Sequence, residues 1–185
     1  MKTSLFRPFV LLLATGVFCL PAAAARAQAA DELIAVLTPT KDSAVRGVVT
    51  FTGQPEEKVK VVAHIEGLEP KSVHGFHIHE FGDITSPDGM ATGGHFNPEK
   101  HEHAMPDHPM RHAGDFGNIT ANDAGVADFE LVVDNITLTA GKDAILGRGV
   151  IVHAKPDDGS QPTGNAGPRL AQGVIGVKNT APAKK

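Results

Sequence analysis

The chain has 185 residues and a formal net charge of −4, with 17 Lys and Arg against 21 Asp and Glu. This acidic balance argues against nucleic acid as a partner, because binding to a phosphate backbone depends on basic side chains. The length is sufficient for one domain with its own hydrophobic core. Two compositional features call for a chemical explanation: ten histidines, and a single cysteine, Cys19.

The first 27 residues have the pattern of a secretory signal peptide. A positively charged start precedes an apolar run over 9–20, which is too short for a comfortable membrane span. Small residues follow, and their A-x-A patterns predict cleavage after Ala27 or Ala29. Cleavage would remove Cys19 and three basic residues, so the mature chain would carry a charge of about −7 and no disulfide. We therefore expect export to the periplasm or the extracellular space, with no stable membrane insertion.

Residues 30–180 are expected to form one all-β domain, followed by a disordered tail over 181–185. Short runs that alternate apolar and polar residues are typical of half-buried strands, and turn residues separate them. No segment shows a sustained helical period, which favours a sandwich or a flattened barrel. The eight expected strands cover residues 33–37, 48–52, 58–65, 73–80, 118–120, 127–133, 149–153 and 173–178.

Two segments interrupt this series of strands. Residues 81–115 are rich in Gly, Pro, His and Asp, and residues 154–168 form a shorter loop. A loop of about 35 residues inside a compact domain needs either a function or an anchor. Because most of the histidines lie between His74 and His112, a bound metal is a candidate for that anchor.

The clearest local metal motif is His77-Ile78-His79. Side chains alternate along a strand, so His77 and His79 share one face about 6.6 Å apart, while Phe76 and Ile78 point to the core. Two imidazoles in this arrangement can converge on one metal ion. A single His-x-His motif is more often a surface pair without a role, so the interpretation depends on the rest of the chain.

Five motifs together resemble the copper–zinc superoxide dismutase family in order and spacing. They are GFHIHEFGD at 75–83, GHFNP at 94–98, RHAGDFGN at 111–118, VH at 152–153 and TGNAGPRL at 163–170. The resemblance extends over residues 33–177 and implies an eight-stranded Greek-key barrel with an immunoglobulin-like sandwich appearance. It also implies an enzyme that dismutates superoxide to oxygen and hydrogen peroxide by a copper redox cycle, with a histidine-bridged structural zinc. A homodimer is favoured because residues 146–148 and 174–177 resemble the interface segments of the family.

The resemblance implies two metal sites that share one histidine, with one copper and one zinc per chain. The implied copper ligands are His77, His79, His95 and His153. The implied zinc ligands are His95, His103, His112 and Asp115. Four imidazoles suit Cu(II), and three nitrogens with one carboxylate suit a closed zinc site. As the bridging ligand, His95 would also take up and return a proton during the reaction.

Other histidines compete for these roles. The spacing of the family selects the zinc ligands named above and leaves His101 and His108 as solvated loop residues. His74 lies two positions before Phe76, so both side chains are on the core-facing side of the strand. We therefore expect His74 to be buried and hydrogen-bonded. His64 matches no ligand and is expected at the surface.

The resemblance gives roles to two further residues. Asp157 would accept hydrogen bonds from one copper histidine, His77, and one zinc histidine, His103, and so orient both rings. Asp158 is the alternative for this role. Arg169 would attract the superoxide anion, because a guanidinium is always charged and holds its donors in a rigid fork.

The chain departs from the family at the long loop. Most relatives carry a disulfide between the start of this loop and the last strand, but residues 84–94 contain no cysteine, and Gln172 occupies the last-strand position. Zinc is the only replacement anchor that the sequence offers. The rival hypothesis is a metal-buffering or delivery protein on the same barrel, and the shared His95 and the anion-attracting Arg169 argue against it. Intact zinc ligands oppose a copper-only enzyme.

Overall fold

The structure is a computed structural model that describes residues 31–181. The predicted signal peptide over 1–27 lies outside the described residues, as do residues 182–185 of the predicted tail. No helix within 31–181 has the length and apolar character that crossing a membrane requires.

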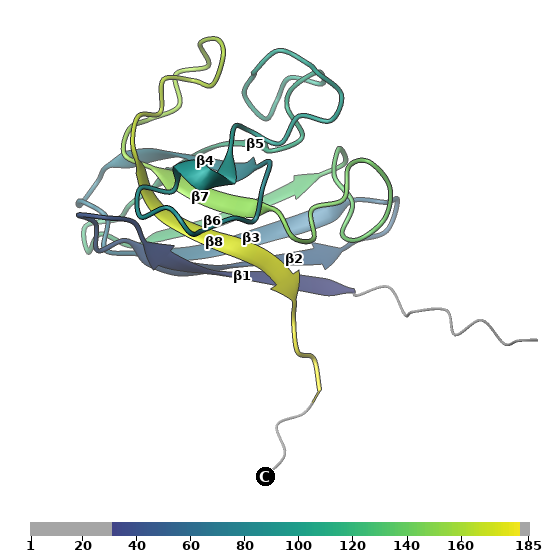
Figure 1. Cartoon of the computed structure of the whole chain (residues 1–185), viewed down its shortest axis with the longest axis horizontal. Helices are drawn as coiled ribbons and strands as arrows, with labels where there is room; N and C mark the ends of the chain where they lie inside the picture. Colours follow the sequence, from purple (N-terminus) through teal and green to yellow (C-terminus); the bar gives the residue numbers. More distant parts are fainter. Residues whose placement is uncertain (1–30, 182–185) are drawn as a thin grey trace, which may run out of the picture.

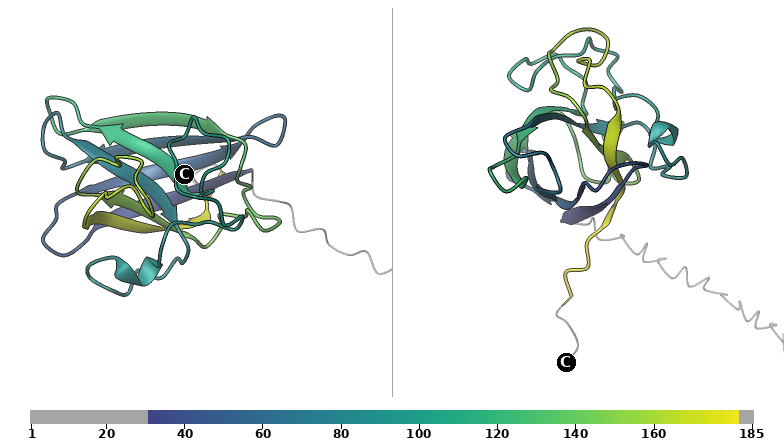
Figure 2. Two further views of the ribbon diagram at one scale, coloured as in Figure 1. Left: turned by 90° about the horizontal axis from the view of Figure 1, so that it is seen from above. Right: turned by 90° about the vertical axis from the view of Figure 1, so that its left-hand side faces the viewer.

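Eight strands and one short 3₁₀ helix, η1, make up the regular structure of the described residues. In chain order they are β1 (Glu32–Pro39), β2 (Arg46–Gly53), β3 (Val59–Glu66), β4 (Val73–His79), η1 (Met90–Thr92), β5 (Asp115–Thr120), β6 (Ala127–Val133), β7 (Gly149–His153) and β8 (Arg169–Val177). Antiparallel pairing connects the strands in the order β5-β4-β7-β8-β1-β2-β3-β6 (Figure 1). The outermost strands β5 and β6 also contact each other, so the sheet closes almost completely into a barrel (Figure 2). The all-β barrel expected from the sequence is confirmed.

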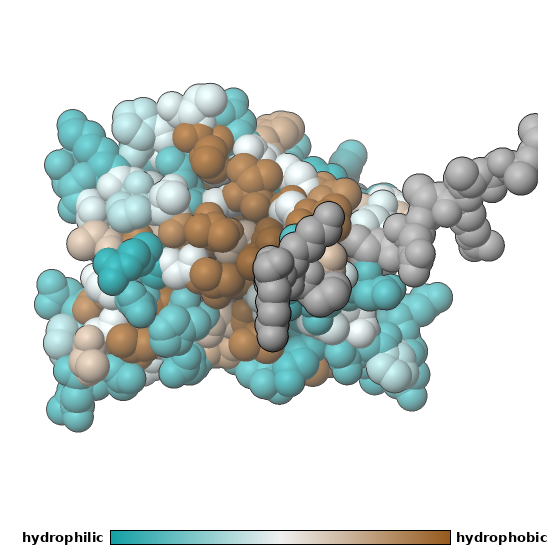
Figure 3. Space-filling view, turned by 90° about the horizontal axis from the view of Figure 1, so that it is seen from below, coloured by the Kyte–Doolittle hydropathy of each residue, from teal (hydrophilic) through white to brown (hydrophobic). Residues whose placement is uncertain are grey.

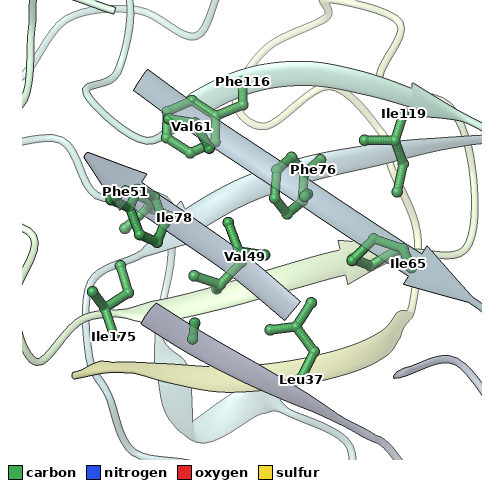
Figure 4. Close-up of a cluster of buried hydrophobic side chains, with 14 of the residues drawn as sticks. Leu37, Val49, Phe51, Val61, Ile65, Phe76, Ile78, Phe116, Ile119 and Ile175 are labelled. Carbon is green, nitrogen blue, oxygen red and sulfur yellow. The ribbon is translucent and has the colours of Figure 1, made fainter. Parts of the chain in front are cut away.

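Alternating side chains fill the interior of this barrel. Every second residue of β3 is buried, from Val59 to Ile65. Phe76 and Ile78 of β4 point into the same core and have no exposed surface (Figure 4). The ring of Phe76 lies edge-on to that of Phe129, with 5.4 Å between centroids. Each such side chain contributes about 1.5–3 kcal/mol of transfer free energy when it leaves water.

Two strands begin three or more residues earlier than the sequence pattern predicts. β5 begins at Asp115 instead of residue 118, and β8 begins at Arg169 instead of residue 173. Both extensions lie where the pairing register shifts, opposite β4 in one case and opposite β7 in the other. In β5, Gly117 adopts a φ of 73°, which interrupts the alternation that marks a strand. As a result Asp115 and Arg169 are held by the sheet instead of by loops.

The strand β4 is buried on both faces. Its even-numbered side chains face the barrel core, and loops cover the face that carries His77 and His79. The long loop after β4 and the loop over 154–168 rise on the same side of the barrel (Figure 1). They are joined where the backbone N–H of His103 donates to Oε1 of Gln161 at 3.1 Å and Nε2 of Gln161 donates to the His103 carbonyl at 2.7 Å. These loops enclose a polar interior against the outer wall of the barrel.

Candidate metal centre

Two groups of potential metal ligands lie buried beneath the loops. Within each group the ligand atoms are within 4.8 Å of one another. The first group is His77, His79, His95 and His153, and the second is His95, His103, His112 and Asp115. The structure thus brings together the seven residues that the resemblance implies as ligands, and His95 belongs to both groups.

Strand pairing positions the first group. His77 and His79 project from β4, and His153 ends the neighbouring strand β7. A single β-bridge places His95 of the long loop opposite His79. The rings of His77 and His95 then lie 4.0 Å apart between centroids.

Backbone carbonyls determine which ring nitrogen faces the centre of the first group. His79 Nδ1 lies 2.9 Å from the Gly93 carbonyl oxygen, and His153 Nδ1 lies 3.1 Å from that of Gly167. A carbonyl only accepts, so each Nδ1 carries the ring proton and donates it. The Nε2 atoms therefore keep their lone pairs, and these two atoms lie 3.3 Å apart. Two such lone pairs facing each other suit a shared cation.

One carboxylate orients a histidine from each group. Asp157 Oδ2 accepts from His77 Nε2 and its Oδ1 accepts from His103 Nε2, both at 2.9 Å. Asn118 holds Asp157 in place: the Asp157 N–H donates to Asn118 Oδ1 at 2.7 Å, and Asn118 Nδ2 donates to the Asp157 carbonyl at 2.9 Å. The alternative residue, Asp158, is exposed and contacts neither histidine.

The ring nitrogens of His77 and His103 that point away from Asp157 indicate whether metal ions fit the two groups. Nδ1 of His77 and Nδ1 of His103 are buried and have no hydrogen-bond partner among the described residues. His103 Nδ1 is 2.9 Å from Asp115 Oδ2 but lacks the alignment of a hydrogen bond. An unsatisfied buried polar atom costs about 1–3 kcal/mol. A metal ion in each group would satisfy these atoms, so the residues fit two metals.

The second group is assembled around Asp115, which is fully buried. Its Oδ1 lies 2.8 Å from His95 Nδ1 and 3.3 Å from His112 Nδ1. Its Oδ2 accepts the backbone N–H groups of Ala104 at 3.2 Å and His112 at 3.1 Å. Three imidazoles and one carboxylate make the donor set of a closed four-coordinate zinc site. Because Nδ1 of His95 faces this group, Nε2 is the atom that its ring offers to the first.

Burial keeps the imidazoles of the first group neutral. Burial lowers the pKa of His153 to about 3. Burial also lowers the pKa of His95 to about 4, although the hydrogen bond with Asp115 acts to raise it. The pKa of His79 is well below its usual value, first through burial and then through nearby positive charges that include Arg169. Neutral imidazole is the form that binds a metal.

The second group contains an ionised carboxylate. Burial alone would raise the pKa of Asp115, but interactions with the surrounding histidines outweigh it and hold this pKa well below the usual range. Burial alone would lower the pKa of His103, but the carboxylates of Asp115 and Asp157 outweigh it and raise the pKa to about 9. An ionised carboxylate beside three imidazoles suits a divalent cation.

Arg169 lies half-buried at the start of β8. Its Nη1 donates to the Gly89 carbonyl and to Thr92 Oγ1, and its Nη2 donates to the Gly93 carbonyl at 2.7 Å. A guanidinium has five N–H groups. Nε–H and one Nη2–H therefore have no partner among the described residues and are free to bind an anion.

The histidines outside the two groups follow the sequence predictions, with one exception. His74 is buried between Ser72 Oγ and a backbone carbonyl, as expected. His64 and His108 are exposed, also as expected. His101 is half-buried instead of solvated, because its Nδ1 reaches the Arg111 carbonyl at 3.2 Å.

Sequence reasoning missed several residues that hold this centre in place. Asn118 fixes Asp157, Gln161 fixes the backbone of His103, and the Gly93 carbonyl orients His79. None of them has a local signal, because each acts on a residue more than ten positions away in the chain.

The fold and these contacts define a class of protein: an antiparallel β-barrel with two adjoining buried metal sites, one lined by imidazoles and one that includes a carboxylate. Residues 45–175 match the family described as copper/zinc superoxide dismutase (SODC). The extracellular Cu-Zn superoxide dismutase of Drosophila melanogaster is 48% identical over 142 residues, which cover 72% of this chain and 77% of that protein. The solved structure titled as the clock protein EA4 is 41% identical with a TM-score of 0.74, and the match covers 81% of this chain and 96% of that one. This chain therefore belongs to the copper/zinc superoxide dismutase family.

Membership of the family confirms the enzyme class predicted from the sequence, an oxidoreductase that acts on superoxide. It also confirms copper and zinc as the cofactors, for which the two ligand groups are suitable.

Proposed function

We propose that the enzyme dismutates superoxide at a copper site formed by His77, His79, His95 and His153, next to a zinc site formed by His95, His103, His112 and Asp115. The observation that carries this proposal is the position of His95. Its Nδ1 lies 2.8 Å from Asp115 Oδ1, while its ring stacks 4.0 Å from His77 of the first group. One imidazole can serve both sites if it gives up both ring protons, and two adjacent cations make that loss tolerable.

When bound, copper supplies the one-electron chemistry that oxidises one superoxide to oxygen and reduces a second to hydrogen peroxide, and zinc supplies a closed structural anchor. The protein contributes orientation and protons. The Gly93 and Gly167 carbonyls and Asp157 hold the outward ring protons of the first group, which keeps the inward nitrogens free of protons. Nε2 of His95 would take up one proton and return it to the reduced product, and water would supply the second proton of hydrogen peroxide.

Arg169 provides the positive charge that attracts the anionic substrate. Burial is the largest cause of the lowered pKa values of His79 and His153, and the charge of Arg169 adds to both, which places its field at these ligands. Its Nε–H and one Nη2–H remain to meet an anion. Steering of this kind raises association rates by about 10- to 1000-fold.

A metal-buffering protein is the competing function, and it needs neither a shared imidazole nor an anion-guiding arginine. The test is to load the purified mature protein with one equivalent each of copper and zinc, count the bound metals, and measure superoxide dismutation. We expect one copper and one zinc per chain and rapid dismutation. A protein that holds both metals without activity would be a buffer.

We propose that two copies associate through an apolar surface formed by Phe81, Leu146 and Val174, which are 51%, 42% and 36% exposed. These residues lie close together, because a Cβ added at Gly82 would meet the Gly147 carbonyl at 2.2 Å and Val174 at 2.9 Å. Figure 3 shows apolar side chains gathered on the face seen from below in Figure 1, where β1, β2 and β8 lie. Light scattering should show a dimer, and Leu146→Glu should yield a monomer. A monomeric wild-type protein would contradict this interface.

We also propose that the protein is exported, with a signal peptide over 1–27 and an enzyme domain over 30–180. The signal-like start of the sequence and the extracellular location in the name of the Drosophila relative both support export. N-terminal sequencing of the mature protein tests this, with cleavage expected after Ala27 or Ala29.

A further inference from the structure

The segment over 84–93, between β4 and His95, supplies the acceptors that orient Arg169. These acceptors are the carbonyls of Gly89 and Gly93 and the hydroxyl of Thr92. The Gly93 carbonyl also accepts from Nδ1 of His79 at 2.9 Å. The positions of the guanidinium and of one copper-site imidazole therefore depend on where this segment lies.

The first half of this segment, residues 84–88, is tied to the rest of the protein by few hydrogen bonds. Nε2 of Gln172 donates to the Ser86 carbonyl at 3.1 Å and lies 3.5 Å from that of Ile84, which is at the limit for a hydrogen bond. The backbone N–H of Lys41 donates to the Pro87 carbonyl at 2.6 Å. The other hydrogen bonds of residues 84–88 stay within the loop. The amide of Gln172 is thus the one side chain of the described residues that joins this half of the segment to the barrel by hydrogen bonds.

The environment of Gln172 leaves its amide only one favourable orientation. The residue lies on β8 and is 5% exposed. A reversed amide would place Oε1 against two carbonyl oxygens, which repel it, so the NH₂ group must face the loop. In this orientation Oε1 is buried without a partner among the described residues, which is unfavourable. The hydrogen bond that the NH₂ group donates to the loop is the stabilising contribution of this side chain.

We propose that Gln172 is a positioning residue for the reaction. By holding the carbonyls of Ser86 and Ile84 it fixes the segment over 84–93, and this segment in turn aims the free N–H groups of Arg169 and the ring of His79. The inference rests on the proposed roles of the copper site and Arg169, and it adds a specific residue that keeps them aligned.

Gln172→Met tests this, because methionine has a similar length and no donor. The matched control is Gln54→Met, the same change at a half-buried glutamine outside this segment, whose amide donates only to the neighbouring Gly53 carbonyl. Both variants are studied as the copper- and zinc-loaded enzyme. Hydrogen exchange measures the protection of the amides in residues 84–93, and a titration with azide, followed by Cu(II) absorption, measures how well a small anion binds.

We expect Gln172→Met to keep both metals, to exchange the amides of 84–93 faster, and to bind azide about 3- to 10-fold more weakly, the range for loss of one hydrogen bond. Gln54→Met should match the wild type in both measurements. Unchanged exchange and azide affinity in Gln172→Met would overturn the proposal. So would a lower melting temperature with unchanged azide affinity, since Gln172 would then only stabilise the fold.

If Gln172→Met does not fold, Gln172→Asn keeps the amide but shortens its reach by one methylene. Azide affinity in that variant should fall between wild type and the range given above, and an affinity equal to wild type would overturn the proposal. Failure of the wild-type enzyme to bind azide would instead overturn the proposed copper site, because Gln172 is intact in that protein.

Discussion

Replacing Asp157 by asparagine should weaken both metal sites, and copper more than zinc. The carboxylate accepts two imidazole N–H groups at 2.9 Å, from His77 and His103. Asparagine keeps one oxygen and puts an NH₂ group in place of the other, so one imidazole N–H would face a donor. That ring can relieve the conflict only by moving its proton to Nδ1, which is the atom aimed at the metal.

The surroundings of Asp157 indicate which ring is affected. Its Oδ1 accepts from Gly159 N–H at 2.9 Å as well as from His103, whereas the hydrogen bond found at Oδ2 comes from His77. The asparagine oxygen will therefore take the Oδ1 position, and its NH₂ group will face His77. Loss of such an orienting partner typically lowers metal affinity about 10- to 100-fold, which corresponds to about 1.4–2.8 kcal/mol.

The assay is a competition between the protein and chelators of known affinity, run separately for copper and zinc. Asp158→Asn is the matched control, since it makes the same chemical and charge change one residue away at an exposed position. We expect Asp157→Asn to lose about 10- to 100-fold in copper affinity and less in zinc affinity, and Asp158→Asn to lose neither. Wild-type affinities in Asp157→Asn would refute the orienting role, and a larger loss of zinc than of copper would refute the assigned amide orientation.

Three further predictions concern the bridge, the arginine and pH. Removing zinc should change the Cu(II) EPR spectrum, because His95 belongs to both groups, and an unchanged spectrum would mean that the sites share no ligand. Arg169→Ala should lower the second-order rate by about 10-fold or more and flatten its dependence on salt, with metal content unchanged; a wild-type rate that ignores ionic strength would remove the steering role. The metal-free protein should melt at its highest temperature near pH 6.5. Below that pH the unfolded chain takes up protons that the folded state excludes, since burial lowers the pKa of His95 to about 4 and that of His153 to about 3. Above it the folded state keeps a proton on His103 that the unfolded chain gives up, because the neighbouring carboxylates raise the pKa of His103, against burial, to about 9, so this stabilisation is lost as the pH rises toward 9. A melting temperature that stays constant from pH 4 to 9 would contradict these shifts.

The strands and the His-x-His motif could be predicted because their signals are local. Alternation of apolar residues marked β3 and β4 and placed Phe76 and Ile78 in the core, where the structure has them. The signal was lost at Asp115 and Arg169, where a bulge and a register shift break the alternation. Pairing with a neighbouring strand, and not local pattern, extends β5 and β8 over these residues.

The anchor of the long loop shows the limit of local reasoning most clearly. From the sequence, zinc was the only candidate to replace the absent disulfide. The structure adds side-chain anchors, since Arg169 and Gln172 of β8 donate hydrogen bonds to the carbonyls of the segment over 84–93. A glutamine in a strand gives no sign of the loop it will contact, because that loop lies more than eighty residues earlier.

The sequence by itself determined the all-β class, the eight strands, and, through the spacing of its motifs, the family and its metals. Only the tertiary structure decided how the seven candidate ligands meet, which nitrogen of each ring faces inward, and which aspartate links His77 to His103. The physical reason is that strand identity depends on neighbours along the chain, whereas ring orientation depends on single acceptors that only folding brings within hydrogen-bonding distance.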